Sequence, residues 1–117
     1  MRRGEIWWAS LEEPRGSEPG FRRPVVIVSA NSFNVSNIST VLVAVITSNT
    51  RLAGAPANVM LTKKQSGLGR DSAINLSQLL TLDKAFLTER VGSLKPEKVN
   101  ELNSGLQLVL GLKSGVA

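Results

Sequence analysis

Two residues at the junctions between loops and apolar strands have side chains that suit chemistry on a phosphate. Arg23 comes directly before Pro24 at the start of one apolar run, and Thr47 comes directly after another. Proline pushes the residue before it towards extended conformations, so Arg23 sits on a backbone of limited freedom. A guanidinium offers a fixed fork of donors that matches a phosphate, and a hydroxyl adds a further hydrogen bond. Together they could stabilise charge on a phosphodiester in a transition state, although spacing alone favours an ordinary strand-end arginine and a turn residue.

A Gly- and Pro-rich stretch over residues 12–22 precedes Arg23 and is long for a hairpin loop. Loops of that length in small domains are often functional. Within it, Ser17, Glu18 and Gly20 supply a hydroxyl, a carboxylate and exposed backbone amides, a combination that can cradle an anion and orient an arginine. A simple surface turn explains the same residues equally well.

Polar residues also interrupt or follow other apolar strands. Ser48 and Asn49 extend the small polar run that begins at Thr47, as at a strand end that opens at a surface. Gln78 is polar on an otherwise apolar strand face, so it is either a sheet-end group or a reader of bases. The neighbours Trp7 and Trp8 face opposite ways on a strand, and we expect one in the core and the other at a subunit interface or stacked on a base.

Composition limits the chemistry that is open to the chain. Its 117 residues include no cysteine and no histidine, so thiol catalysis, disulfides and the commonest metal ligands are excluded. Asp71 and Asp83 are isolated acids, so we expect no metal site. The first 70 residues hold nine basic and four acidic residues, which accounts for the whole net charge of +5 and favours a nucleic-acid partner. No apolar run approaches the roughly 20 residues of a membrane span, so we expect a cytoplasmic protein.

The pattern of apolar residues predicts a mainly β fold: a small, strongly bent β-barrel or sheet with a C-terminal helix. The helix begins at Pro96, ends at Gly111 and places its apolar side chains on one face at Val99, Leu102, Leu106 and Leu110. We expect one domain over residues 1–112 and a tail over 113–117. The predicted strands are 5–11, 24–30, 40–46, 58–62, 72–79 and 87–93, with helical turns at 31–34 and 82–86.

Several of these segments together resemble the MazF/PemK toxin family over nearly the whole chain. They are Arg3–Trp8, Gly16–Gly20, Arg23–Val26, Thr47–Ser48, Arg70–Ser72 and Gln78, in the order and rough spacing of that family. The resemblance implies a compact SH3-like or CcdB-like barrel that works as a homodimer. It also implies the toxin half of a type II toxin–antitoxin pair, whose antitoxin covers the RNA groove with a flexible, acidic segment.

The implied activity is metal-independent, sequence-specific cleavage of single-stranded RNA, usually mRNA, with no cofactor. The family's catalytic arginine falls on Arg23 and its catalytic Ser/Thr on Thr47. Ser17, Glu18 and Gly20 fall in the loop over the active site, and Gln78 lies near the RNA groove. Ser48 and Asn49 open the 48–57 loop which, with the 62–71 loop, is expected to read the bases.

The expected reaction is attack of the RNA 2′-hydroxyl on its own phosphate, which gives a 2′,3′-cyclic phosphate and a 5′-hydroxyl. Arg23 stabilises the extra charge or donates a proton to the leaving oxygen, and the general base stays unnamed, with Glu18 as a candidate. Two alternatives stay open: a CcdB-like poison of DNA gyrase, and a non-catalytic SH3-like RNA-binding module. Gyrase poisons of this fold act through the terminal helix and lack the pair of Arg23 and Thr47, which favours the nuclease.

Overall fold

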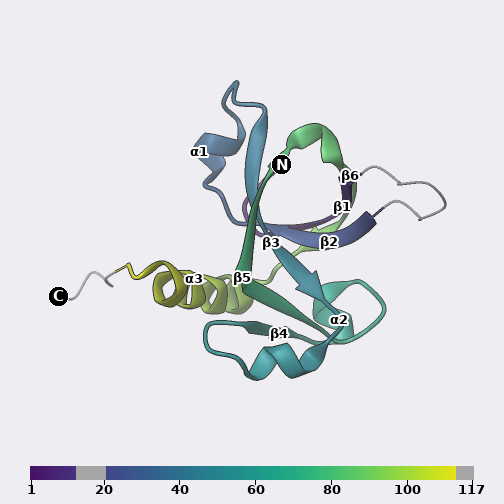
Figure 1. The fold of residues 1–117 in the computed structure, drawn as a ribbon, viewed down its shortest axis with the longest axis vertical. Helices are drawn as coiled ribbons and strands as arrows, with labels where there is room; N and C mark the ends of the chain where they lie inside the picture. The colour runs from purple at the N-terminus through teal and green to yellow at the C-terminus, as the bar shows by residue number, and fades with distance from the viewer. Residues whose placement is uncertain (13–20, 113–117) are drawn as a thin grey trace.

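One antiparallel sheet of six strands curls into a half-barrel, and a C-terminal helix packs against it (Figure 1). The computed structural model describes residues 1–12 and 21–112. The strand order is β4-β5-β3-β2-β1-β6, so β4 and β6 are the edges of the sheet. The strands are β1 (Glu5–Glu12), β2 (Phe21–Ile27), β3 (Thr40–Thr47), β4 (Val59–Leu61), β5 (Ser72–Asp83) and β6 (Leu87–Ser93). The predicted mainly β fold with a terminal helix is confirmed.

The helices are short except for the last one. They are α1 (Asn31–Asn34), η1 (Thr50–Gly54), α2 (Lys63–Ser66), η2 (Lys84–Phe86) and α3 (Pro96–Leu110). Pro96 begins α3 and Gly111 ends it in the left-handed conformation, with φ of 68°, as predicted. None of the helices in the described ranges is long and apolar enough to cross a membrane.

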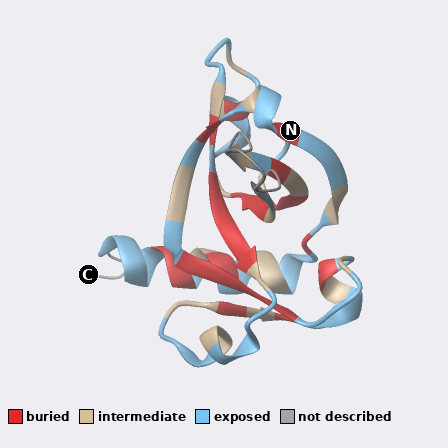
Figure 2. Cartoon of the chain, turned by 45° about the vertical axis from the view of Figure 1, so that its right-hand side comes forward, coloured by how far each residue is buried: buried red, intermediate tan, exposed pale blue. Residues whose placement is uncertain are grey.

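The core divides between the two faces of the sheet because side chains alternate along β2 and β3. Val26, Ala44 and Ile46 join Leu102 and Leu106 of α3 in one cluster. On the opposite face a second cluster holds Val25, Ile27, Val41 and Val43 with residues of β1, β5 and β6. Figure 2 shows this buried centre, with exposed residues at the far end of α3.

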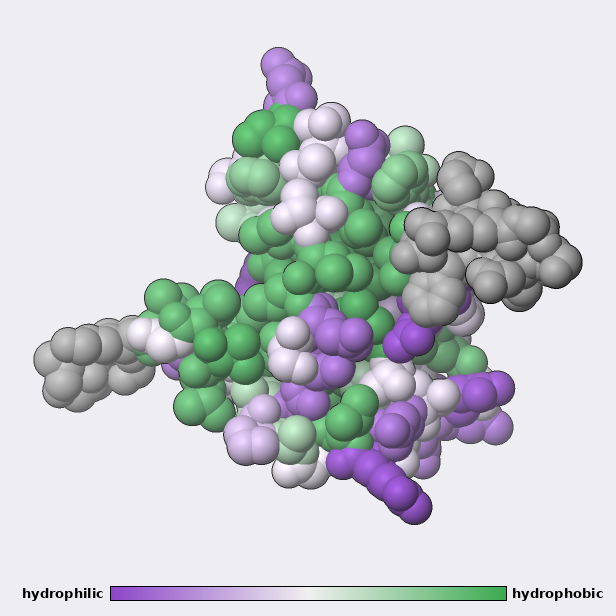
Figure 3. Space-filling model, in the orientation of Figure 1, coloured by the Kyte–Doolittle hydropathy of each residue, from purple (hydrophilic) through white to green (hydrophobic). Residues whose placement is uncertain are grey.

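The predicted apolar face of α3 is correct for its first turns and wrong at its end. Leu102 is fully buried and Val99 half-buried, whereas Leu110 is 53% exposed. The reason is that the last turns of α3 extend past the sheet (Figure 1). Figure 3 shows hydrophobic side chains gathered on this projecting end. The large exposed apolar residues there are Leu108, Val109, Leu110 and Leu112.

The largest differences from the predicted strands are in β2, which ends at Ile27 rather than at residue 30, and in β5, which continues to Asp83 over the start of the predicted helical turn at 82–86. β2 starts at Phe21, so the predicted loop over 12–22 ends earlier and Arg22 and Arg23 belong to the strand, where they pair with β1. The stretch 72–79, predicted as half-buried, is buried on both faces from Ser72 to Leu76, because β5 lies between β3 and β4 beneath α3. β5 then bulges, since Val45 pairs with Asn75 while the preceding Ala44 pairs with Leu79.

Candidate active site

The candidate site is an opening where β2 and β3 separate. The two strands pair from Ile27 only as far as Val25, which lies opposite Val45. Beyond that pair, the strand pairing of Pro24 and Arg23 is with β1, and that of the end of β3 is with β5. Proline has no N–H to give to a ladder, so Pro24 fits a position where the partner strand has already moved away. The separation leaves a gap between the two residues that the sequence singled out.

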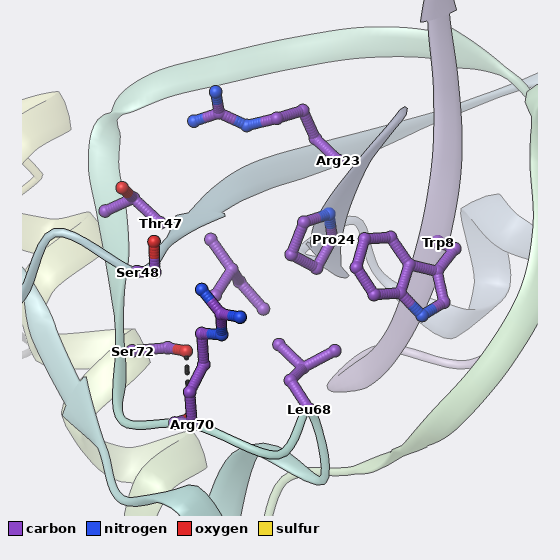
Figure 4. Close-up of a pocket in the computed structure, with 9 residues that line it drawn as sticks. Trp8, Arg23, Pro24, Thr47, Ser48, Leu68, Arg70 and Ser72 are labelled. Atoms are coloured by element: carbon purple, nitrogen blue, oxygen red, sulfur yellow. Dashed lines mark hydrogen bonds between the residues drawn. The ribbon is translucent and has the colours of Figure 1, made fainter. Parts of the chain in front are cut away.

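A pocket of about 470 Å³ fills this gap (Figure 4). The two strands and the connection between β4 and β5 line it together. Among the described residues of its wall there are two guanidiniums and three hydroxyls, and none is acidic. The lining residues are Trp8, Arg23, Pro24, Ile46, Thr47, Ser48, Leu68, Arg70 and Ser72. A concave site with convergent cations and hydroxyls, walled by apolar side chains, suits an anion attached to a planar or apolar group.

The structure therefore brings Arg23 and Thr47 to one pocket from two different strands. Arg23 is half-buried, and its side chain reaches across the top of the pocket towards the end of β3 (Figure 4). The Thr47 hydroxyl accepts a hydrogen bond from the Asn49 N–H at 3.1 Å. That contact orients the oxygen and leaves its own proton as a donor for a bound anion.

The residues after Thr47 take different positions. Ser48 lines the pocket, and its contact with substrate stays a prediction. Asn49 does not; its side-chain oxygen accepts from the Arg51 N–H at 3.3 Å and caps the short helix η1. The contribution of Asn49 to the site is thus the backbone N–H that fixes Thr47.

Gln78 lies outside this pocket, on the bulge of β5. Its side-chain oxygen accepts from Asn75 at 3.1 Å, and the residue is exposed. Its predicted contact with RNA stays a prediction. Ser17, Glu18 and Gly20 lie outside the described residues.

Arg22 and Arg23 are neighbours with different partners. Arg22 forms an ion pair of 2.9 Å with Glu89 on β6, and its guanidinium lies over the Trp8 ring at 4.7 Å from the ring centroid. Both members of that ion pair are more than half exposed, so the pair contributes little to stability. Only Arg23 of the two reaches the pocket.

The two tryptophans also separate. Trp7 packs against the second core cluster, and its indole N–H donates to Glu5 at 3.1 Å. Trp8 forms part of the pocket wall. The structure thus assigns core packing to Trp7 and gives Trp8 a place where a base can stack.

Glu5 is a buried acidic residue of β1 that lies outside the pocket wall. Burial raises its pKa, but the Arg2 N–H, the Trp7 indole and the charge of Arg90 together outweigh burial and hold the pKa below its ordinary value of 4.5. Arg90 contacts it at 2.9 Å. Glu5 stays charged at neutral pH and ties β1 to β6.

Leu68, Arg70 and Ser72 also line the pocket, although the sequence named none of them as a site residue. Leu68 and Arg70 belong to the 62–71 loop that was expected to read the bases, and Arg70–Ser72 is one of the segments that resemble the family. The sequence held a signal for Arg70, because this arginine lies just before the predicted strand 72–79 much as Arg23 lies just before the predicted strand 24–30. In the described ranges no cluster of acidic residues could hold a metal ion.

Comparisons with known proteins identify the family. A family model described as "PemK-like, MazF-like toxin of type II toxin-antitoxin system" matches residues 2–110. The chain is 46% identical over 112 residues to endoribonuclease MazF2 of Mycobacterium bovis and likewise to endoribonuclease MazF6 of Mycobacterium tuberculosis. Each alignment covers 96% of this chain and 98% of the relative.

Solved structures share the fold at lower identity. A mycobacterial endoribonuclease in complex with its cognate antitoxin superposes with a TM-score of 0.80 at 24% identity, over 97% of this chain and 98% of that one. MazF of Deinococcus radiodurans superposes with a TM-score of 0.73 at 21% identity, over 95% of this chain and 96% of that one.

Proposed function

The chain belongs to the PemK-like, MazF-like toxin family of type II toxin–antitoxin systems, and we propose that its RNA-cleaving site is the pocket of Arg23 and Thr47. It is an endoribonuclease, as are relatives that match nearly its full length at 46% identity. The observation that carries the assignment of the site is the separation of β2 and β3, which places a guanidinium and an oriented hydroxyl at one opening.

The proposed reaction begins with attack of an RNA 2′-hydroxyl on its adjacent phosphorus. The 2′-hydroxyl loses its proton to a general base, for which Glu18 is the candidate, as a bond from the 2′-oxygen to phosphorus forms. The bond to the 5′-oxygen breaks and that oxygen gains a proton, so the products are a 2′,3′-cyclic phosphate and a 5′-hydroxyl. Because the substrate carries its own nucleophile, proximity is already supplied. The protein must hold the phosphate in line and stabilise the second negative charge that develops on it.

Arg23 and Thr47 suit those two tasks. A guanidinium stays protonated at neutral pH, so Arg23 stabilises charge and donates to the leaving 5′-oxygen rather than removing a proton. It is half-buried, where water screens its charge less than at the open surface. Thr47 donates its hydroxyl proton to a non-bridging phosphate oxygen, with the Asn49 N–H holding the hydroxyl in place.

The partners that we propose follow from the same surface. A pocket with two arginines and no acid in its described wall suits single-stranded RNA, and it equally suits an acidic antitoxin segment that competes for it. The exposed apolar end of α3 supports a homodimer, because large apolar patches on a monomer usually mark an interface. We place the reaction in the cytoplasm, where mRNA is translated.

The test uses a long single-stranded RNA with the purified protein in EDTA, followed by mapping of the 5′ ends. We expect discrete cuts that leave 5′-hydroxyl ends. Arg23→Ala removes the donor to the developing charge and should slow cleavage about a hundred- to a thousandfold. Arg22→Ala is the matched control, since it removes the same charge from the neighbouring residue of β2, which does not line the pocket. Because Arg22 lies over the Trp8 ring of the pocket wall, this variant should lose some activity, but far less than Arg23→Ala.

Two results would contradict the assignment. An Arg23→Ala protein that cuts at the normal rate would remove Arg23 from the site. Cuts that appear only with a divalent metal would show that the charge is stabilised by a different group.

A further inference from the structure

We propose that Arg70 is a second phosphate-binding residue of the pocket, which holds the RNA phosphate next to the one that is cleaved. The inference rests on the proposed function, RNA cleavage at Arg23 and Thr47. It concerns the wall of the pocket opposite Arg23, built by the connection between β4 and β5.

Arg70 points into the pocket from that connection. In Figure 4 its side chain rises from this connection, with Ser48 on one side and Leu68 on the other. Its guanidinium faces Arg23 across the pocket. In the described part of the chain this guanidinium forms no ion pair and no hydrogen bond, and the residue is exposed. It is therefore a cation available to an anion in the pocket.

The backbone of Arg70 is held firmly although its side chain is exposed. Its carbonyl oxygen accepts from the Ser66 hydroxyl at 3.1 Å and from the Ser72 hydroxyl at 3.2 Å. The next residue, Asp71, accepts from the Lys63 N–H at 2.7 Å. An arginine on a fixed backbone loses less freedom on binding a ligand than one on a mobile loop.

Ser66 is the centre of this arrangement. It is 1% exposed and its hydroxyl oxygen also accepts from the Leu68 N–H at 3.1 Å. Leu68 and Arg70 both line the pocket, so one buried hydroxyl contacts the backbone of two wall residues. Ser66 is a positioning residue for this wall of the pocket.

The different exposures of the two arginines indicate different tasks. Charge stabilisation in a transition state is strongest where water is excluded, which favours the half-buried Arg23 for the cleaved phosphate. An exposed arginine contributes mainly to binding in the ground state. A single strand carries one phosphate per nucleotide, so an RNA that places one phosphate at Arg23 can bring an adjacent one to Arg70 on the opposite wall.

The experiment compares Arg70→Gln with Lys64→Gln. Lys64 is an exposed cation on α2 that lies outside the pocket, so its substitution removes the same charge from the same connection. The probe is a fluorescent RNA that contains the cleavage site mapped for the unsubstituted protein, with a 2′-O-methyl group at the cleaved position. Its dissociation constant is measured over a range of salt concentrations, and cleavage of the unmodified RNA is measured at saturation.

We expect Arg70→Gln to weaken binding about ten- to a hundredfold, the usual loss for a charge-assisted hydrogen bond. The slope of log affinity against log salt should fall by about 0.7, the value for one phosphate of a single strand. The saturated cleavage rate should stay within about twofold. Lys64→Gln should change the dissociation constant much less.

Three results would overturn the proposal: affinity equal to that of the unsubstituted protein, a loss no larger than that of Lys64→Gln, or a lower saturated rate at unchanged affinity. The last result would place Arg70 at the cleaved phosphate. An unsubstituted protein that leaves all RNA intact would instead refute the proposed function, and binding of a fully 2′-O-methylated RNA would still report on Arg70.

Discussion

Ser66→Ala tests whether a buried hydroxyl in the β4–β5 connection positions one wall of the pocket. The substitution removes one oxygen at a residue that is 1% exposed and leaves the apolar core unchanged. In the native structure this oxygen accepts from the Leu68 N–H, and its proton is shared between the carbonyl oxygens of Lys63 and Arg70.

The loss of stability in Ser66→Ala depends on which of the three backbone groups bonded to the hydroxyl keep another hydrogen-bond partner. The Arg70 carbonyl retains the Ser72 hydroxyl, and the Lys63 carbonyl retains the Gly67 N–H at 3.3 Å. The Leu68 N–H loses its acceptor. A fully buried donor left unpaired costs about 1–3 kcal/mol. Leu68 is only half-buried, so we expect a loss of about 1 kcal/mol in the free energy of unfolding and a fall of about 4 °C in the midpoint of thermal unfolding.

The assay combines thermal or urea unfolding with the RNA measurements. Because the loosened connection holds Arg70 less firmly, we expect weaker binding of the uncleavable RNA than in the unsubstituted protein, by less than Arg70→Gln causes. The saturated cleavage rate should not change, since Arg23 and Thr47 are on other strands. Ser104→Ala, at an exposed position of α3, is the matched control and should leave stability and binding nearly unchanged.

Unfolding stability and RNA affinity test two different steps of the argument. Normal stability of Ser66→Ala would refute the hydrogen-bond argument itself. Lower stability with normal RNA affinity would show that Ser66 supports the fold alone and does not position Arg70.

Two further predictions concern the stability of the fold around the site. In Gly105→Ala the new Cβ would overlap the Ala57 carbonyl oxygen and the Leu76 side chain, so α3 must shift. Overpacking outweighs the gain of about 1 kcal/mol in helix propensity, and urea unfolding should show a net loss of about 1–3 kcal/mol in the free energy of unfolding. Equal or higher stability would refute the packing argument. Glu5→Gln should destabilise the protein at pH 7 and much less at acid pH. The folded-state pKa of Glu5 lies below 4.5, so its carboxylate stabilises the fold above pH 4.5. That contribution is lost as the pH falls through the folded-state pKa. Urea unfolding of both proteins between pH 3 and pH 7, values that bracket the ordinary range for a glutamate, checks this, and a difference that does not shrink towards acid pH would contradict it.

Local sequence patterns predicted the parts of the fold that depend on neighbouring residues. The run from Thr40 to Ile46 is β-branched and apolar, which suits a buried strand, and β3 covers it. Pro96 and Gly111 set the ends of α3 because each restricts or permits a particular backbone conformation. The same local pattern identified Arg23 and Thr47, since Arg23 lies directly before one apolar run and Thr47 directly after another.

Pairing between distant strands, in contrast, decided the extent of β2 and the shape of β5. Nothing in residues 12–22 signals that β1 continues the ladder past Pro24 to Phe21. The bulge of β5 arises because Ala44 and Val45, adjacent on β3, find partners four residues apart. Such register changes depend on which segments meet, and that information is spread over the whole chain.

For the site, composition and local pattern establish that a guanidinium and a hydroxyl stand at strand ends, that no thiol or imidazole is present, and that the first 70 residues carry the surplus of positive charge. The separation of β2 and β3 beyond Val25, and the approach of Arg70 to the same opening from a third segment, come from long-range packing. A side chain's chemistry is a property of one residue, whereas a pocket exists only where segments distant in sequence pack and leave a space between them.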